Sequence, residues 1–234
     1  MAYTRIKICG IMRTSDAVAA AEAGADAIGL NFFAGPRRIP LDLGRQIVAE
    51  LPPLTTPVAL TSGPSKRFPD APTFDQIRKG TTVITPTLAR PGISTFQFYG
   101  DDLSSMKLRE PCHIWSVCHV EDQNLGGAIY KHLQTLSFTP AALVIDAAVS
   151  GQLGGTGKSV NWTTVAAELL WLRENHPHLV LILAGGLTPE NVADAIRTTR
   201  PYAVDVSSGV EVPNQPGAKD PMKICDFIQA ARSA

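Results

Sequence analysis

The sequence lacks a long apolar run and has no excess of charge of either sign. A helix that crosses a membrane needs about 18 or more consecutive apolar residues, and no stretch reaches that length. The N-terminal stretch MAYTRIKICGIMRTSD carries charges where a secretory signal peptide has its apolar centre. Lys plus Arg and Asp plus Glu both number 21, so the formal net charge is zero. We therefore expect no membrane partner and no nucleic-acid partner.

Cysteine is also scarce. The chain has only four cysteines, and they are irregularly spaced: Cys9, Cys112, Cys118 and Cys225. Such spacing in a chain of this length is not typical of a disulfide framework, so we interpret all four as reduced thiols. The expected location is therefore cytoplasmic, and each cysteine is either a packing residue or a chemical one.

The segment 112–119, CHIWSVCH, contains two Cys-His pairs that raise the question of a metal site. Successive side chains of a strand point to opposite faces, so Cys112 and Cys118 would lie on one face and His113 and His119 on the other. Four ligands cannot converge on one ion from two faces of a strand. The sequence therefore predicts no metal site here.

What the sequence does contain is an alternation of short β-branched segments with longer segments of helical period. Repeated βα units favour a parallel sheet, and eight units are the number that closes a barrel. The predicted fold class is therefore α/β, a (β/α)8 TIM barrel. Because no linker or repeat divides the chain, we expect a single domain over residues 1–234. The predicted strands are 5–10, 27–33, 57–63, 95–100, 113–119, 142–147, 179–186 and 203–209.

Capping signals and apolar periodicity place several helices. The first is expected to begin with Thr14 and Ser15 as capping candidates and to end at Gly24. Another is expected to have Pro189 at its first position and Thr188 before it as the cap. Amphipathic segments predict two more helices, over 162–174 and over 219–232.

The stretch 62–94 interrupts this regular pattern. It holds five prolines, and Pro86 interrupts any helix that begins with the segment FDQIRKG. We therefore expect an irregular third βα unit.

The first predicted strand ends near Cys9, in the motif KICGI. Ile6 and Ile8 are the natural helix-facing pair, so Lys7 and Cys9 should point into the barrel. The C-terminal ends of the strands carry the active site in barrels of this kind. A small buried thiol is the commoner role for a cysteine, but this position also makes Cys9 a candidate reagent.

Asp146 ends the apolar segment LVID of the sixth predicted strand. A carboxylate at this place is costly to bury unless it is paired or takes part in chemistry. Its alternative role is to cap the backbone of the loop that follows. The first and sixth strands lie on different sides of a closed ring, so Cys9 and Asp146 could flank a substrate as one base and one acid.

Two glycine-rich strand ends come last in the chain, AGGL at 184–187 and DVSSGVE at 205–211. The loops after the seventh and eighth strands of many barrels present backbone N–H groups to a phosphate. The alternative is a pair of tight βα turns without a ligand. Their occurrence together at these two units favours a phosphate site.

Two other segments contain groups that bind anions. The segment 151–159, GQLGGTGKS, is not a nucleotide-binding P-loop, because Gln152 stands where the first glycine is required. We interpret this segment as a flap over the site. Arg37 and Arg38 follow the second strand and are either candidate anion-binding groups or a solvated surface pair.

Taken together, these motifs resemble those of a known family. KICGI, PRRI, GGTGKSVNW, AGGLTPENV and VDVSSGVE occur in the order that is typical of phosphoribosylanthranilate isomerase, over nearly the whole chain. The resemblance implies a (β/α)8 barrel of tryptophan biosynthesis. Its activity is the Amadori rearrangement of N-(5-phosphoribosyl)anthranilate to 1-(2-carboxyphenylamino)-1-deoxyribulose 5-phosphate. It implies a small phosphosugar substrate, no cofactor, no metal, and a monomer or homodimer.

The resemblance also implies roles for residues at the matching positions. Cys9 is the expected general base, which takes a proton from the sugar C2, and Asp146 is the expected general acid, which protonates the ring oxygen. These roles require the site to lower the pKa of the thiol and to raise that of the carboxyl group. Arg37 is expected to hold the anthranilate end. The residues expected to bind the phosphate are Gly185, Gly186, Ser207, Ser208 and Gly209.

The chain departs from the family pattern at several positions. It has Tyr99 where members read a histidine in QLHG, WSVCHV where they read close to KAIRV, and Asn161 for the aspartate of FDW. The third strand, VALTSG, lacks the usual GVFVN ending. Two other functions stay open, namely another phosphosugar isomerase or epimerase, and a barrel that binds a phosphorylated ligand without catalysis. A redox thiol protein is disfavoured because no CxxC motif accompanies Cys9.

Overall fold

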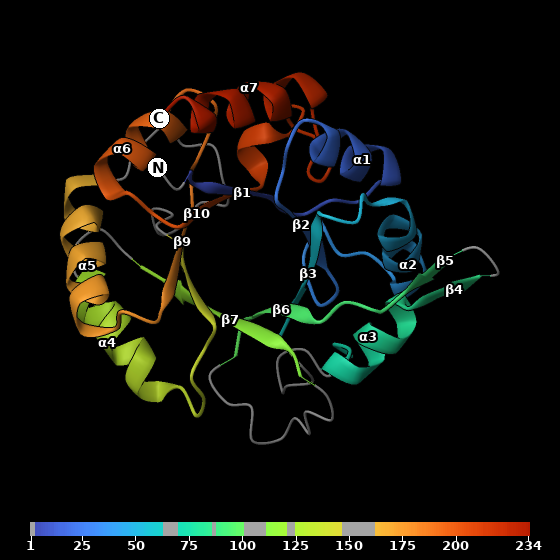
Figure 1. The fold of residues 1–234 in the computed structure, drawn as a ribbon, viewed down its shortest axis with the longest axis horizontal. Coiled ribbons are helices and arrows are strands. Elements are labelled where there is room, and N and C mark those ends of the chain that lie inside the picture. The colour runs from blue at the N-terminus through green and yellow to red at the C-terminus, as the bar shows by residue number, and fades with distance from the viewer. Residues whose placement is uncertain (1–2, 63–69, 86–87, 101–110, 121–124, 147–161) are drawn as a thin grey trace.

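Eight parallel strands close into a barrel, with the order β1, β10, β9, β8, β7, β6, β3 and β2 around the ring (Figure 1). The structure is a computed structural model that describes residues 3–62, 70–85, 88–100, 111–120, 125–146 and 162–234. The eight predicted strands and the TIM-barrel fold class are confirmed. The strand bounds are Arg5–Ile8 (β1), Ala27–Asn31 (β2), Thr56–Thr61 (β3), Thr95–Phe98 (β6), His113–His119 (β7), Ala142–Asp146 (β8), Val180–Ala184 (β9) and Ala203–Val206 (β10).

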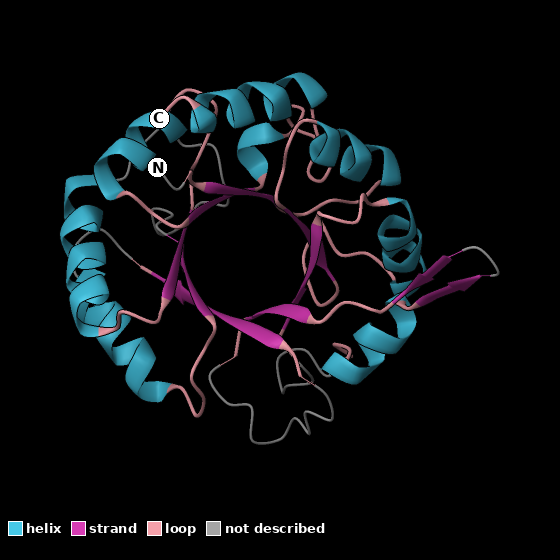
Figure 2. Ribbon diagram, in the orientation of Figure 1, coloured by secondary structure: helices cyan, strands magenta, loops and turns pink. Residues whose placement is uncertain are grey.

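Helices form an outer ring around the strands (Figure 2). The helix α5 buries Val165, Leu169 and Leu172, which confirms its predicted apolar face. Within the described ranges, no helix combines the length and the apolar composition needed to span a membrane. The helix bounds are Thr14–Glu22 (α1), Leu41–Glu50 (α2), Phe74–Thr81 (α3), Leu125–Thr135 (α4), Trp162–Asn175 (α5), Val192–Thr199 (α6) and Pro221–Arg232 (α7), with a short 3-10 helix at Ser208–Val210 (η1).

The third βα unit is irregular, as predicted. After α3 the chain forms an antiparallel hairpin of β4 (Val83–Thr85) and β5 (Leu88–Arg90) before it enters β6. This hairpin extends outward from the ring beside α2 and α3 (Figure 1). Pro86 lies outside the described residues.

Three predicted helix starts differ from the observed ones. Thr14 and Ser15 do not cap α1, because Arg13 occupies the N-cap position and no side chain caps the helix. The helix α6 begins at Val192 rather than Pro189, because Asn191 closes a turn before it by accepting the Thr188 N–H at 2.8 Å. The last helix, α7, begins at Pro221 rather than at residue 219.

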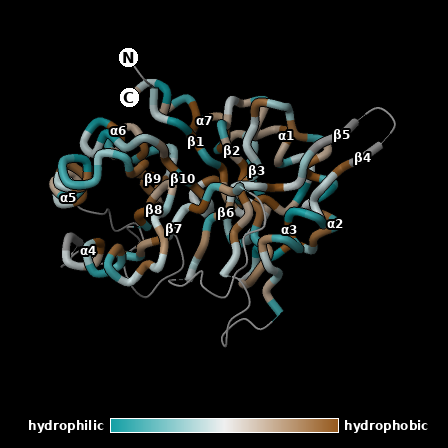
Figure 3. Tube along the Cα trace, turned by 60° about the horizontal axis from the view of Figure 1, so that its bottom comes forward, coloured by the Kyte–Doolittle hydropathy of each residue, from teal (hydrophilic) through white to brown (hydrophobic). Residues whose placement is uncertain are grey.

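Two apolar layers lie on the two sides of the barrel wall. One layer lies between strands and helices and contains Ile6 and Ile8, while the other fills the barrel with small and branched side chains such as Val144 and Ile182. Figure 3 shows apolar stretches along several of the strands. Lys7 points into the barrel, where its Nζ donates to the Asp205 carboxylate at 2.7 Å. The predicted phase of the first strand is therefore confirmed.

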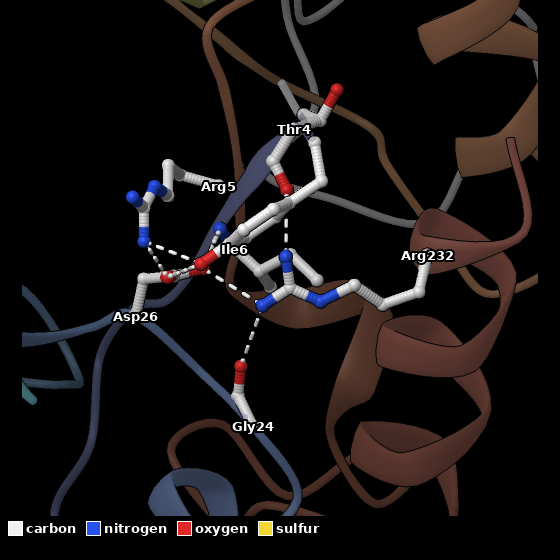
Figure 4. Close-up of polar contacts among 7 residues, drawn as sticks. Thr4, Arg5, Ile6, Gly24, Asp26 and Arg232 are labelled. Atoms are coloured by element: carbon white, nitrogen blue, oxygen red, sulfur yellow. Dashed lines mark hydrogen bonds and ion pairs between the residues drawn. The ribbon is translucent and has the colours of Figure 1, made fainter. Parts of the chain in front are cut away.

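At the N-terminal end of the barrel, Asp26 joins the first strand to the last helix (Figure 4). Its carboxylate accepts hydrogen bonds from Arg5 Nη1 at 2.8 Å, from the Ile6 N–H at 2.9 Å and from Arg232 Nη2 at 3.0 Å. Arg232 Nη1 also donates to the Thr4 carbonyl at 3.1 Å. We call these contacts of Asp26 and Arg232 with Thr4, Arg5 and Ile6 the terminal clasp. The terminal clasp lies at the end of the barrel opposite to the C-terminal strand ends.

Candidate active site

Cys9 follows β1 directly at the C-terminal end of the barrel. Its N–H continues the strand ladder by donating to the Val206 carbonyl at 2.8 Å. The thiol is 6% exposed and lies against Gly29 of β2, where an added Cβ would come within 2.6 Å of Sγ. A glycine at position 29 is therefore what leaves room for the thiol.

Charged groups surround the Cys9 thiol. Burial raises its pKa, and the nearby Asp205 carboxylate raises it further, while Lys7 and Lys219 act in the opposite direction. The predicted lowering of the Cys9 pKa is therefore wrong. The pKa of Cys9 rises because the thiolate loses its hydration inside the barrel, and the two ammonium groups do not fully compensate for this loss.

Asp146 is the last residue of β8, and it lies half-buried at the same end of the barrel. The strands β10 and β9 separate β1 from β8 around the ring, so Cys9 and Asp146 come from different arcs of one rim. His119, at the end of β7, places Nδ1 3.4 Å from Asp146 Oδ2, and this contact raises the pKa of His119. Sequence reasoning missed this pair; the adjacency of the fifth and sixth strands could have indicated it.

The cysteine and histidine at the end of the segment 112–119 lie on opposite faces of β7, as predicted. Cys118 packs into the apolar layer on the helix side, whereas His119 lies beside Asp146. Among the residues that the structure describes, no group of three or more His, Cys, Asp or Glu side chains could hold a metal ion.

Arg37 reaches the same rim from the loop after β2. Its Nε donates to Glu211 Oε1 at 2.7 Å and its Nη2 to Oε2 at 2.8 Å, a two-bond pairing that fixes the plane of the guanidinium. Because this pairing uses the Nε–H and one N–H of Nη2, both N–H groups of Nη1 and the second one of Nη2 remain as donors for an anion. Arg38 is exposed and does not take part.

Glu211 is a buried acceptor for several donors. Besides Arg37, it accepts from Lys219 Nζ and from the Gly217 N–H, both at 3.0 Å. Burial would raise the pKa of Glu211, but the bonds from Arg37 and Lys219 outweigh it and hold the pKa below its ordinary value. Sequence reasoning missed Glu211 and Lys219 as site residues, although Glu211 is the last residue of the quoted motif VDVSSGVE.

The loops after β9 and β10 contact each other. Gly185 and Gly186 have positive φ angles of 90° and 62°, which only glycine adopts readily. A Cβ at Gly209 would lie 1.9 Å from the Leu187 carbonyl oxygen, so glycine is what allows the two loops to touch. The structure therefore brings the two predicted glycine-rich loops together. The predicted flap, residues 151–159, and Asn161 lie outside the described residues.

Gly10 links these loops to the arginine. An added Cβ at Gly10 would meet Arg37 Cδ at 2.6 Å and Ser207 Oγ at 2.9 Å. The side chain of Arg37 and the hydroxyl of Ser207 therefore both lie where a side chain at position 10 would stand, against the backbone that follows Cys9. Ser207 precedes η1, which contains Ser208 and Gly209.

A separate cavity of about 380 Å³ opens at the other end of the barrel. Arg5, Asp26, His113 and Tyr202 contribute to its lining. These residues lie at the N-terminal ends of the strands, where barrel enzymes do not carry their chemistry. The candidate site is therefore the rim that holds Cys9.

Comparisons with known proteins identify the family of the chain. A family model described as N-(5'phosphoribosyl)anthranilate (PRA) isomerase matches residues 83–230. The chain is 38% identical over 234 residues to the N-(5'-phosphoribosyl)anthranilate isomerase of Pseudomonas fluorescens, covering 99% of this chain and 100% of that protein. It is 38% identical over 238 residues to the isomerase of Acidithiobacillus ferrooxidans, covering 99% of each.

Solved structures extend the likeness to the fold. Phosphoribosyl anthranilate isomerase from Thermotoga maritima matches with a TM-score of 0.76 and 28% identity, over 99% of this chain and 100% of that one. A phosphoribosyl anthranilate isomerase in complex with reduced 1-(o-carboxyphenylamino)-1-deoxyribulose 5-phosphate matches with a TM-score of 0.72 and 27% identity, with the same coverage. Sequence and fold thus agree over essentially the full length, and the chain belongs to the N-(5'-phosphoribosyl)anthranilate isomerase family.

Proposed function

We propose that Cys9 and Asp146 carry out the rearrangement that defines this isomerase family, as general base and general acid. The observation that supports this assignment is their placement on separate arcs of one barrel rim, with the two glycine-rich loops on the strands between them. An acid and a base on different sides of one bound sugar can act at different atoms of it.

The proposed reaction starts at the ring oxygen of the phosphoribosyl group. Asp146 gives its proton to that oxygen as the ring opens to a Schiff base between C1 and the anthranilate nitrogen. The Cys9 thiolate then takes the proton from C2, and the electron pair of that C–H bond moves to form the enolamine. Tautomerisation of the enolamine gives the 1-amino-1-deoxyribulose ketone, so the two residues exchange protons with the substrate without a redox step.

The remaining site residues bind the two ends of the substrate. Gly185 and Gly186, together with the segment 207–209, bind the phosphate through backbone N–H groups, since both loops expose backbone at the strand ends. An added Cβ at Gly186 would have no heavy atom within 4 Å, so a ligand can approach that backbone closely. Arg37 binds the anthranilate carboxylate through the N–H donors of Nη1 and Nη2 that its pairing with Glu211 does not use.

The activity itself is tested with purified protein and N-(5'-phosphoribosyl)anthranilate. We expect conversion to the deoxyribulose phosphate, and growth of a tryptophan auxotroph that lacks the isomerase when it expresses this chain. Binding of the substrate without turnover, together with no growth, would support the non-catalytic alternative. Turnover of a different phosphosugar in its place would support the other barrel isomerases.

We further propose a cytosolic enzyme that works as a monomer or homodimer. The thiolate chemistry assigned to Cys9 needs a reduced thiol, which the cytosol maintains. All four cysteines are free in the structure.

Glu211→Gln is expected to raise KM by about 10- to 100-fold with kcat changed much less, because a charge-assisted hydrogen bond contributes about 1.5 to 3 kcal/mol. The amide cannot pair with Arg37 and Lys219 as the carboxylate does, so Arg37 loses its fixed orientation. Steady-state kinetics separates the two constants. Glu22→Gln, an exposed change on α1, is the matched control. An unchanged KM in Glu211→Gln would contradict the role assigned to Arg37.

The pH dependence of kcat/KM follows from the raised pKa of Cys9, above its ordinary 9.0. The active form has a deprotonated thiol and a protonated Asp146, so the two groups hold one proton between them. The fraction of active form does not change with pH while the pair holds this one proton. We expect a plateau that falls only above about pH 9, where the last of these protons is lost. A decline that already begins near neutral pH would contradict this result.

A further inference from the structure

Tyr99 lies inside the barrel, directly after β6. Its N–H donates to the Thr61 carbonyl at 3.0 Å, so the alternation of the strand continues through it. Gln97 and Tyr99 therefore point inward, while Phe96 stacks on Phe74 of α3 with ring centroids 4.4 Å apart. Tyr99 packs against the apolar layer that fills the barrel.

The hydroxyl of Tyr99 has one fixed partner. Gln97 Nε2 donates to it at 2.8 Å, and Gln97 itself is 2% exposed. Because the amide is the donor in this contact, the phenol proton is available for a different acceptor. Within the described part of the chain, no side chain accepts that proton.

Ionisable groups of the site on other strands act on this hydroxyl. Burial, followed by the charges of Cys9, Asp205 and Asp146, raises the pKa of Tyr99 well above its ordinary value. These groups lie on or directly after β1, β10 and β8, so the phenol is within electrostatic reach of the proposed base, the proposed acid and the buried ion pair. It consequently stays protonated and acts as a hydrogen-bond donor.

The ring of Tyr99 is the middle member of an aromatic row. Its centroid lies 5.1 Å from that of Phe33, in the loop after β2, and 6.2 Å from that of His119, at the end of β7. Rings at these separations present apolar faces and edges to a planar ligand. Phe33 and Arg37 stand on the same loop, so the row begins beside the group assigned to the anthranilate carboxylate.

We propose that Tyr99 contacts the substrate directly, with its hydroxyl donating a hydrogen bond to the sugar oxygen at C2 and its ring packing, with Phe33, against the anthranilate ring. This inference rests on the proposed function. The phenol keeps its proton in this contact. Charge develops on the C2 oxygen when the hydroxyl at C2 loses its own proton, as the enolamine becomes the ketone, and the phenol donor stabilises that charge.

Tyr99→Phe tests the hydroxyl and Tyr99→Leu tests the ring. We expect Tyr99→Phe to lower kcat by about 10- to 100-fold with KM within about threefold, since it removes a donor that acts mainly in the transition state. Tyr99→Leu should in addition raise KM, and raise the Kd of reduced 1-(o-carboxyphenylamino)-1-deoxyribulose 5-phosphate, by about tenfold. Tyr130→Phe, an exposed change on α4, is the matched control.

The outcomes separate this inference from the proposed function. If the wild-type protein does not convert N-(5'-phosphoribosyl)anthranilate, the proposed function is wrong. If it does, and Tyr99→Phe has the wild-type kcat, the hydroxyl contact is overturned; an unchanged Kd in Tyr99→Leu overturns the ring contact. Tyr99→His restores an N–H donor, and its kcat should exceed that of Tyr99→Phe, a rescue that a purely structural role of the phenol would not produce.

Discussion

Cys9→Ala lowers kcat by about 100- to 10,000-fold, because the variant has no group that can take the proton from C2. The substitution only removes Sγ from a tight contact with Gly29, so the strand and its ladder are retained. Steady-state turnover of N-(5'-phosphoribosyl)anthranilate measures the loss. Binding of the reduced product analogue should persist, since the phosphate loops and Arg37 are unchanged.

Cys118→Ala is the matched control for this variant. Cys118 is as deeply buried as Cys9, with 2% exposure, but it packs on the helix side of the wall. It should lose some stability, as deletion of a buried group does, and keep its turnover. Wild-type turnover in Cys9→Ala would refute the assignment of the base.

Asp146→Asn is expected to lower kcat by a similar factor of about 100 to 10,000, because an amide cannot give a proton to the ring oxygen. The change keeps the shape of the side chain, so the fold should persist. The pKa of His119 should fall in this variant, since the contact with Asp146 is what raises it. NMR titration of His119 checks this pKa, and turnover checks the acid.

Asp26→Asn provides the contrast to this second variant. Asp26 is also partly buried, but it belongs to the terminal clasp at the other end of the barrel. Its loss should lower the thermal midpoint and leave turnover per folded molecule unchanged. If Asp146→Asn behaves in the same way as Asp26→Asn, Asp146 is a structural residue and the acid must be sought elsewhere on the rim.

The fold was predictable because its signals are local. In β1, side chains alternate between the two sides of the barrel wall, so Ile6 and Ile8 face the helices and Lys7 faces the interior. This pattern can be recognised within one short segment of sequence. The start of α6 was predicted wrongly for a related reason. Asn191 competes as a turn-former with the Thr188–Pro189 signal, and the sequence alone does not decide between two adequate local solutions.

The site was predictable in its positions but not in its electrostatics. The pKa of Cys9 depends on Lys7 from its own strand, on Asp205 from the last strand and on Lys219 beyond it. Burial opposes the two lysines, and the sign of the sum follows only from the three-dimensional arrangement. Glu211 escaped prediction for the same reason, since its partner Arg37 lies 174 positions away in the chain.

The terminal clasp around Asp26 has a topological consequence. Arg232 and Thr4, close to the two ends of the chain, are in hydrogen-bond contact at the end of the barrel opposite to Cys9 and Asp146 (Figure 4). A short peptide could therefore connect the two ends without crossing the rim. The chain could then be opened at the hairpin of β4 and β5, which is outside the ring, and a circular permutant made in this way would keep all eight barrel strands and the site whole.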